Sequence, residues 1–262
     1  KQIQKNRNML KFKTHINNKN NEWITFIHGF GGSSNIWHKQ VRDLYRHYNL
    51  LFVDLRGHGK SKLVPSGYEF KLSNVCDDII KVLQSLKIKS SHFVGISLGS
   101  VLIFKLIETN KKYINKSILS GAITSLNRFS RFLLFCLNLL KNVLPNILLY
   151  KLFAYIIMPK SNHKESRLTF IREAKLIDTN VFNQLIKFIP ELKKYILNLK
   201  HINFDKYILF LSGKEDYLFS EDVRKFSSKN KLHSYFSVDG AGHVVNIDNP
   251  ATFNSKLLDF LK

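Results

Sequence analysis

One stretch, residues 91–99, constrains the fold of this 262-residue chain more than any other. Strand-forming apolar residues run into a Gly-x-Ser-x-Gly turn centred on Ser97, and a helical pattern follows from Val101. In a strand–turn–helix context, this motif indicates a nucleophile elbow that exposes the serine hydroxyl at a tight turn. Side chains at Gly95 and Gly99 would collide with the neighbouring strand or helix, which explains both glycines. The alternative is an ordinary strand-to-helix turn.

The rest of the chain predicts strands that alternate with helices. Several of the strands are apolar at nearly every position, which is typical of strands buried on both faces of a parallel sheet. We therefore expect an α/β fold with a mostly parallel central sheet flanked by helices. Besides the elbow, the expected strands are 9–16 (in an edge hairpin with a polar turn at 17–21), 23–27, 50–55, 114–119, 207–211 and 232–238, and the expected helices are 36–45, 72–86 and one that begins at Pro250.

The pattern changes between residues 122 and 201, where no strand is evident. Helical stretches broken by Pro145, Pro159 and Pro190 replace the alternation. Residues 132–158 are very apolar, but polar residues interrupt them well short of the ~20 apolar residues of a membrane span. We expect residues 122–201 to form a helical cap, or lid, on a core domain built from residues 1–121 and 202–262.

Two glycine-rich loops follow buried strands. Residues 28–32 read His-Gly-Phe-Gly-Gly, and backbone N–H groups of such a loop can stabilise the oxyanion of an acyl-transfer reaction. A phosphate-binding loop is disfavoured because the Lys-Ser/Thr pair of that motif is absent. In the second loop, residues 54–61, we expect Asp54, Arg56 and His58 to hold the loop in place by hydrogen bonds rather than to act in catalysis.

Three polar residues, Ser97, Asp216 and His243, stand in loops after three different buried strands. Their order along the chain is that of a hydrolase triad. In such a triad the histidine takes the serine proton, and the aspartate orients the imidazole and stabilises its charge. The serine then attacks an acyl carbon, and water releases the acid from the acyl-enzyme.

Together, residues 28–32, 54–61, 95–99, 213–216 and 242–243 resemble the motifs of an α/β-hydrolase-fold serine hydrolase of the capped branch. The resemblance implies a helical cap inserted after the sixth strand. It also implies that the backbone N–H groups of Phe30 and Leu98 form the oxyanion hole, while His28 and Gly29 shape the substrate loop. It names no substrate contacts in the cap, and the chemistry requires neither a cofactor nor a metal.

The resemblance and the apolar cap together predict an esterase-like or lipase-like enzyme that cleaves a carboxylic ester, or a related acyl bond, of a fairly apolar small molecule. Two alternatives stay open. One is hydrolysis or a lyase step at a carbon–carbon bond of a diketone-type substrate, which the same triad can perform. The other is a ligand-binding receptor on the same fold with little turnover.

The net charge of +22 is spread over every segment of the chain. Because no nucleic-acid-binding motif accompanies the lysines, we expect no nucleic-acid partner. A weak contact between the basic, apolar cap and a membrane surface stays open. The first residues are polar and basic, with no signal peptide or membrane span in view, so we expect a cytoplasmic protein.

Overall fold

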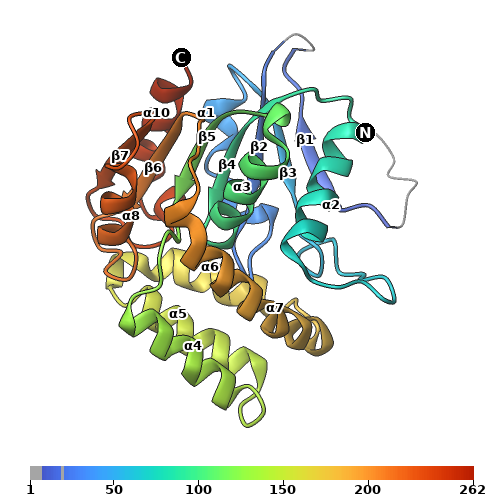
Figure 1. The fold of residues 1–262 in the computed structure, drawn as a ribbon, viewed down its shortest axis with the longest axis vertical. Coiled ribbons are helices and arrows are strands. Elements are labelled where there is room, and N and C mark those ends of the chain that lie inside the picture. The colour runs from blue at the N-terminus through green and yellow to red at the C-terminus, as the bar shows by residue number, and fades with distance from the viewer. Residues whose placement is uncertain (1–7, 19–20) are drawn as a thin grey trace.

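The computed structural model of the chain describes residues 8–18 and 21–262. The basic residues 1–7, on which the expectation of no signal peptide rests, lie outside this part. So do residues 19–20 of the expected hairpin turn. Within the described residues, seven strands form one sheet with helices on both faces (Figure 1).

The sheet confirms the expected mostly parallel arrangement. Its strand order is β1-β3-β2-β4-β5-β6-β7, and every neighbouring pair is parallel except β1 and β3. All six expected strands and the elbow strand are present, with ends shifted by up to three residues. The strands are β1 (Phe12–His15), β2 (Trp23–Ile27), β3 (Asn49–Val53), β4 (Ser91–Ile96), β5 (Ile114–Ser120), β6 (Ile208–Gly213) and β7 (His233–Val238).

Side chains of the central strands alternate between two apolar cores. On one face, Val53 and Phe93 pack with residues of α2 (Leu72–Ser85), α3 (Leu98–Thr109) and α8 (Ser220–Ser227). On the other face, Phe52 and Val94 pack with Trp37 and with residues of α9 (Val245–Asp248) and α10 (Pro250–Leu261). Because successive strand residues point to opposite faces, strands that are apolar at consecutive positions need cover on both sides.

Between β5 and β6, all of the regular secondary structure is helical. The helices of this segment lie beyond one end of the sheet, at the bottom of Figure 1. No helix in the part of the chain that the structure describes is both long and apolar enough to cross a bilayer. The segment contains α4 (Arg128–Leu140), α5 (Asn146–Ile157), α6 (Lys164–Ala174), α7 (Thr179–Asn198) and the short 3₁₀ turns Ser161–His163 and Leu199–His201.

Three sequence-based expectations need correction. The helical segment follows the fifth described strand rather than a sixth, because β1 is the one strand before β2 in the described residues. Pro190 does not break a helix but lies inside α7. Buried side chains on both sides of it, including Phe188 and Leu192, hold α7 in place despite the hydrogen bond that proline removes.

The third correction concerns the helix expected over residues 36–45. In its place stand a 3₁₀ turn, Ser34–Trp37, and the four-residue α1 (Val41–Leu44). Apolar spacing alone did not reveal this division, because both pieces bury their apolar residues against the same face of the sheet.

Candidate active site

The Gly-x-Ser-x-Gly stretch forms the sharp turn that its sequence predicts. Ser97 lies between β4 and α3 with φ 53° and ψ −117°, a strained conformation for a residue with a side chain. A Cβ on Gly95 would lie 2.5 Å from Ile103 Cδ1 and 2.8 Å from the Gly99 backbone, and one on Gly99 would overlap the Ile27 carbonyl oxygen. Both glycines therefore let the turn pack against its own helix and against β2.

The loops after β6 and β7 bring Asp216 and His243 together. The carboxylate Oδ2 of Asp216 lies 2.9 Å from Nδ1 of His243, and both side chains are buried. Backbone bonds hold these two loops in register, since Glu215 N–H donates to the Ala241 carbonyl at 3.0 Å. Gly121, at the end of β5, has φ +47°, and a Cβ there would lie 3.0 Å from His243 Nδ1. The missing side chain lets the backbone and the ring of His243 approach the end of β5.

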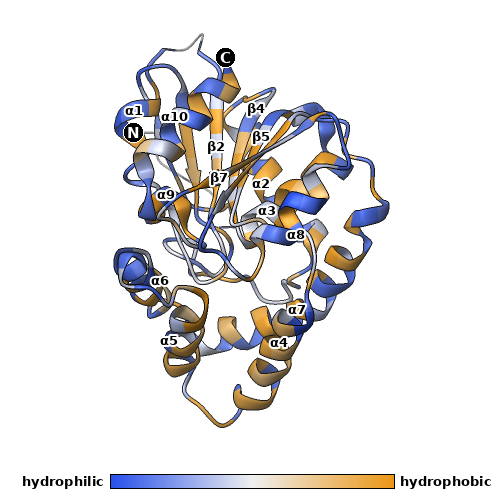
Figure 2. Ribbon diagram, turned by 90° about the vertical axis from the view of Figure 1, so that its left-hand side faces the viewer, coloured by the Kyte–Doolittle hydropathy of each residue, from blue (hydrophilic) through white to orange (hydrophobic). Residues whose placement is uncertain are grey.

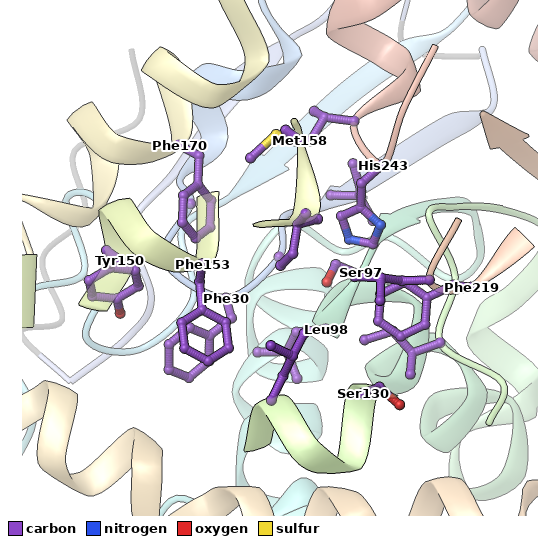
Figure 3. A pocket seen from close by; sticks show the side chains of 18 of the residues that line it. Phe30, Ser97, Leu98, Ser130, Tyr150, Phe153, Met158, Phe170, Phe219 and His243 are labelled. Atoms are coloured by element: carbon purple, nitrogen blue, oxygen red, sulfur yellow. The ribbon is translucent and has the colours of Figure 1, made fainter. Parts of the chain in front are cut away.

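Ser97 and His243 line the same cavity, and the imidazole lies beside the serine hydroxyl in Figure 3. Phe30 and Leu98 line this cavity as well. Neither of their backbone N–H groups has a hydrogen-bond acceptor among the described residues of the chain. Leu98 is the first residue of α3, where the helix has no internal acceptor for its N–H groups. Both donors are thus free to bind an oxygen.

Two buried histidines hold the loop that carries Phe30. The ring of His28 pairs with the Gly29 carbonyl through Nδ1 at 2.8 Å, and its Nε2 accepts the Leu55 N–H at 3.0 Å. The ring of His58 pairs with the Arg56 carbonyl at 3.0 Å, and its Nε2 accepts the Gly31 N–H at 3.2 Å. Both rings are therefore neutral, with the proton on Nδ1.

Burial explains the titration of these histidines. Desolvation lowers the pKa of His28 below its ordinary value and lowers the pKa of His58 to about 3. His28 does not reach the cavity, whereas Gly29 lines it, so His28 shapes the loop from behind.

The loop after β3 confirms the predicted structural role of its polar residues. Asp54 accepts the Ser34 N–H at 2.7 Å and the Lys60 N–H at 2.9 Å. Arg56 forms a buried ion pair with Asp78 of α2 at 2.9 Å. None of the three residues Asp54, Arg56 and His58 lines the cavity, so they fix the loops around it.

The cavity in front of Ser97 measures about 250 Å³ and has an almost entirely apolar wall. Leu133, Leu134 and Leu137 of α4 contribute to it. Tyr150 and Phe153 of α5 contribute as well (Figure 3). The helical segment therefore supplies most of the residues that line the cavity.

Polar contacts attach the helical segment to the loops of the site. The hydroxyl of Ser33 donates to the buried carboxylate of Glu173 in α6 at 2.6 Å. His163 Nε2 pairs with Glu215, the neighbour of Asp216, at 2.8 Å. The same ring fills the space in front of Gly242, where a Cβ would lie 2.6 Å from it.

Sequence reasoning missed several residues that lie at or behind the site. Gly121, Phe219, His163 and Glu173 are among them, and the Phe219 ring packs against that of His243 with the centroids 5.3 Å apart. A glycine at the end of β5 was the one available signal, whereas no local pattern marks His163 or Glu173. In residues 8–18 and 21–262, no group of three or more His, Cys, Asp or Glu side chains is placed to hold a metal ion.

Comparisons with known proteins identify the family and the fold. A family model described as the alpha/beta hydrolase fold matches residues 22–250. The protein named carbamate hydrolase RutD from Pantoea ananatis is 25% identical over 253 residues, which cover 94% of this chain and 90% of that one. Among solved structures, a hydrolase from Pseudomonas aeruginosa has a TM-score of 0.81 at 18% identity, covering 96% of this chain and 94% of its own. The enol-lactonase from Burkholderia xenovorans has a TM-score of 0.80 at 18% identity, covering 96% of both chains.

Proposed function

Since this chain belongs to the alpha/beta hydrolase family, we propose that it is a serine hydrolase that cleaves a carboxylic ester, or a related acyl bond, of a fairly apolar small molecule. The observation that carries the proposal is the meeting of three features at one apolar cavity: the strained Ser97, the His243–Asp216 pair and two unpaired backbone N–H groups.

In this mechanism the free Nε2 of His243 accepts the proton of Ser97 as its oxygen attacks the acyl carbon. Asp216 keeps the imidazole proton on Nδ1 and stabilises the imidazolium that forms. The N–H groups of Phe30 and Leu98 bind the oxyanion, and each such donor contributes on the order of 10²–10³ in rate. His243 then returns the proton to the leaving alcohol, and the same steps with water release the acid from Ser97.

The apolar wall supports an apolar acyl or alcohol group as the part of the substrate that is bound. A cavity of this character gains binding energy mainly from buried hydrocarbon, at about 0.8 kcal/mol per CH₂. The names of two similar proteins denote hydrolysis of a carbamate and of a lactone, so the substrate panel includes both bond types beside simple esters. The panel also includes a diketone, because a carbon–carbon bond hydrolase would cleave the diketone and would not hydrolyse the simple esters.

The proposal is tested by labelling with a fluorophosphonate probe, which reacts with an activated serine. The intact chain is expected to label, Ser97→Ala not at all, and His243→Ala much more slowly. Ser73→Ala, which alters an exposed serine of α2, is the matched control and is expected to label like the intact chain. A folded intact chain that binds apolar esters without labelling or turnover would instead support the ligand-binding receptor.

A further inference from the structure

Helices α4 and α5 expose a large apolar surface on the side that faces away from the cavity. Eight of its side chains are 43–74% exposed. We call this surface the outer α4–α5 face, and it consists of Phe129, Phe132, Phe135 and Leu139 of α4, Val143 of the connection, and Leu148, Leu152 and Tyr155 of α5. Exposed apolar surface on this scale commonly marks an interaction site.

The outer α4–α5 face does not belong to the cavity. The cavity is lined from the same helices by other residues, such as Leu133 and Leu137 of α4 and Phe153 of α5, and by none of the eight. Both helices are therefore apolar on two opposite sides, and α5 carries a single charged residue, Lys151. A helix that is apolar all round requires cover on all sides. The cavity and core cover one side, and the other side carries the eight exposed residues. Both helices lie at the bottom of Figure 2, where the ribbon is largely hydrophobic.

The charged residues on α4, on α5 and on their connection have one sign. No acidic residue occurs between Glu108 and Glu165 in the sequence. The charged residues of α4, α5 and their connection are all basic: Arg128, Arg131, Lys141 and Lys151. A partner must therefore offer apolar surface together with negative charge. A second copy of this chain would bring the same cations against these and carries a net charge of +22 itself, so self-association is opposed by charge.

We propose that the outer α4–α5 face docks on the surface of an anionic lipid bilayer. Amphipathic helices with aromatic and leucine side chains bordered by lysine or arginine lie in such interfaces, with the apolar residues at the boundary between headgroups and acyl chains. Each lysine or arginine near an anionic leaflet adds about 1 kcal/mol of attraction. The connection between α4 and α5, which carries the 74%-exposed Val143, is the part of the ribbon farthest from the sheet in Figure 1 and can reach a flat surface first.

The experiment is sedimentation of the full chain with vesicles of phosphatidylcholine, with and without phosphatidylserine, at low and high salt. We expect binding to the anionic vesicles that weakens as salt rises. The triple variant Phe132→Ser/Phe135→Ser/Leu139→Ser removes apolar contact and is expected to lower vesicle partitioning roughly tenfold or more. Leu63→Ser is the matched control, because Leu63 is 73% exposed in a loop outside this face, and it should bind like the intact chain.

A second variant separates charge from apolar contact. Arg128→Glu/Lys141→Glu/Lys151→Glu is expected to abolish the preference for phosphatidylserine. Hydrolysis of a water-soluble ester should be unchanged in both triple variants, which shows that they fold, since none of these side chains lines the cavity. Ser97→Ala should bind vesicles normally, so a failure of the proposed chemistry leaves this test intact.

Several results would overturn the proposal. One is the absence of binding to anionic vesicles at low salt, and another is equal binding by the serine triple variant. A third is a concentration-dependent dimer in light scattering that the serine triple variant dissociates, because a second copy would then cover this face.

Discussion

The loops at the edge of the sheet and the helices α4 and α5 border the same cavity but are held in different ways. Polar bonds fix the loops: Asp54 bridges two of them, and the buried rings of His28 and His58 fasten the loop of Phe30. Helices α4 and α5 pack mainly through apolar side chains, in a cluster that includes Leu137, Leu149 and Phe182.

For the proposed function, this difference distinguishes the residues that carry out the reaction from those that select the substrate. Directional hydrogen bonds hold the reacting groups in one geometry, which the proposed chemistry requires. Apolar packing depends on volume more than on direction, so it tolerates changes of side chain. Substitutions in the loops should therefore abolish turnover or folding, whereas substitutions in α4 and α5 should change which molecules are accepted.

The largest effect is expected for Asp216→Asn. The amide cannot hold the His243 proton on Nδ1 as the carboxylate does, and kcat should fall on the order of 10⁴-fold. The measurement is steady-state ester hydrolysis, with the melting temperature as the control for folding. A fall of less than tenfold would show that Asp216 does not act as the triad acid.

Gly99→Ala tests the close approach of the elbow to β2. Its new methyl group would overlap the Ile27 carbonyl oxygen, so the backbone must shift. We expect a loss of about 3 kcal/mol in the free energy of unfolding, at the upper end of overpacking effects. Urea unfolding measures it. Gly67→Ala is the comparison: a Cβ there meets nothing within 4 Å, so its cost should be limited to the strain of an alanine at φ +76°, about 1 kcal/mol.

Acid should destabilise the chain through His58. The pKa of this buried ring is about 3, below its ordinary 6.5, so the unfolded chain binds a proton between these values and the folded chain does not. Its contribution is complete above pH 6.5 and is lost as pH falls toward 3, amounting to about 2 kcal/mol between neutral pH and about pH 5. His58→Gln should flatten this part of the unfolding curve, and an unchanged slope would contradict a neutral buried His58.

The smallest effect is expected in the wall of the cavity. Phe153→Ala should enlarge the apolar space and raise the kcat/KM ratio of long to short p-nitrophenyl esters roughly tenfold. Phe132→Ala is the control, because it removes the same side chain from the outer α4–α5 face and should leave that ratio unchanged. If both variants change the ratio to the same extent, the cavity side of these helices does not by itself set the preference for ester length.

The sequence by itself determined the sheet, the order of its strands along the chain, and the site candidates Ser97, Asp216 and His243. These depend on local signals: apolar runs, glycines at tight turns and polar residues at strand ends. The carboxyl ends of parallel strands then meet at one edge, which brought Asp216 and His243 to 2.9 Å as expected.

Only the tertiary structure decided how the helical segment is used. Ser33 is hydrogen-bonded to Glu173, which lies 140 residues further along the chain, and His163 packs against Gly242. No periodic pattern in the sequence predicts either contact. The continuity of α7 through Pro190 and the division of α4 and α5 into a cavity side and an outer side were hidden for the same reason. An apolar pattern in a helix indicates that a side chain must be shielded from water, but only the tertiary structure shows which element shields it.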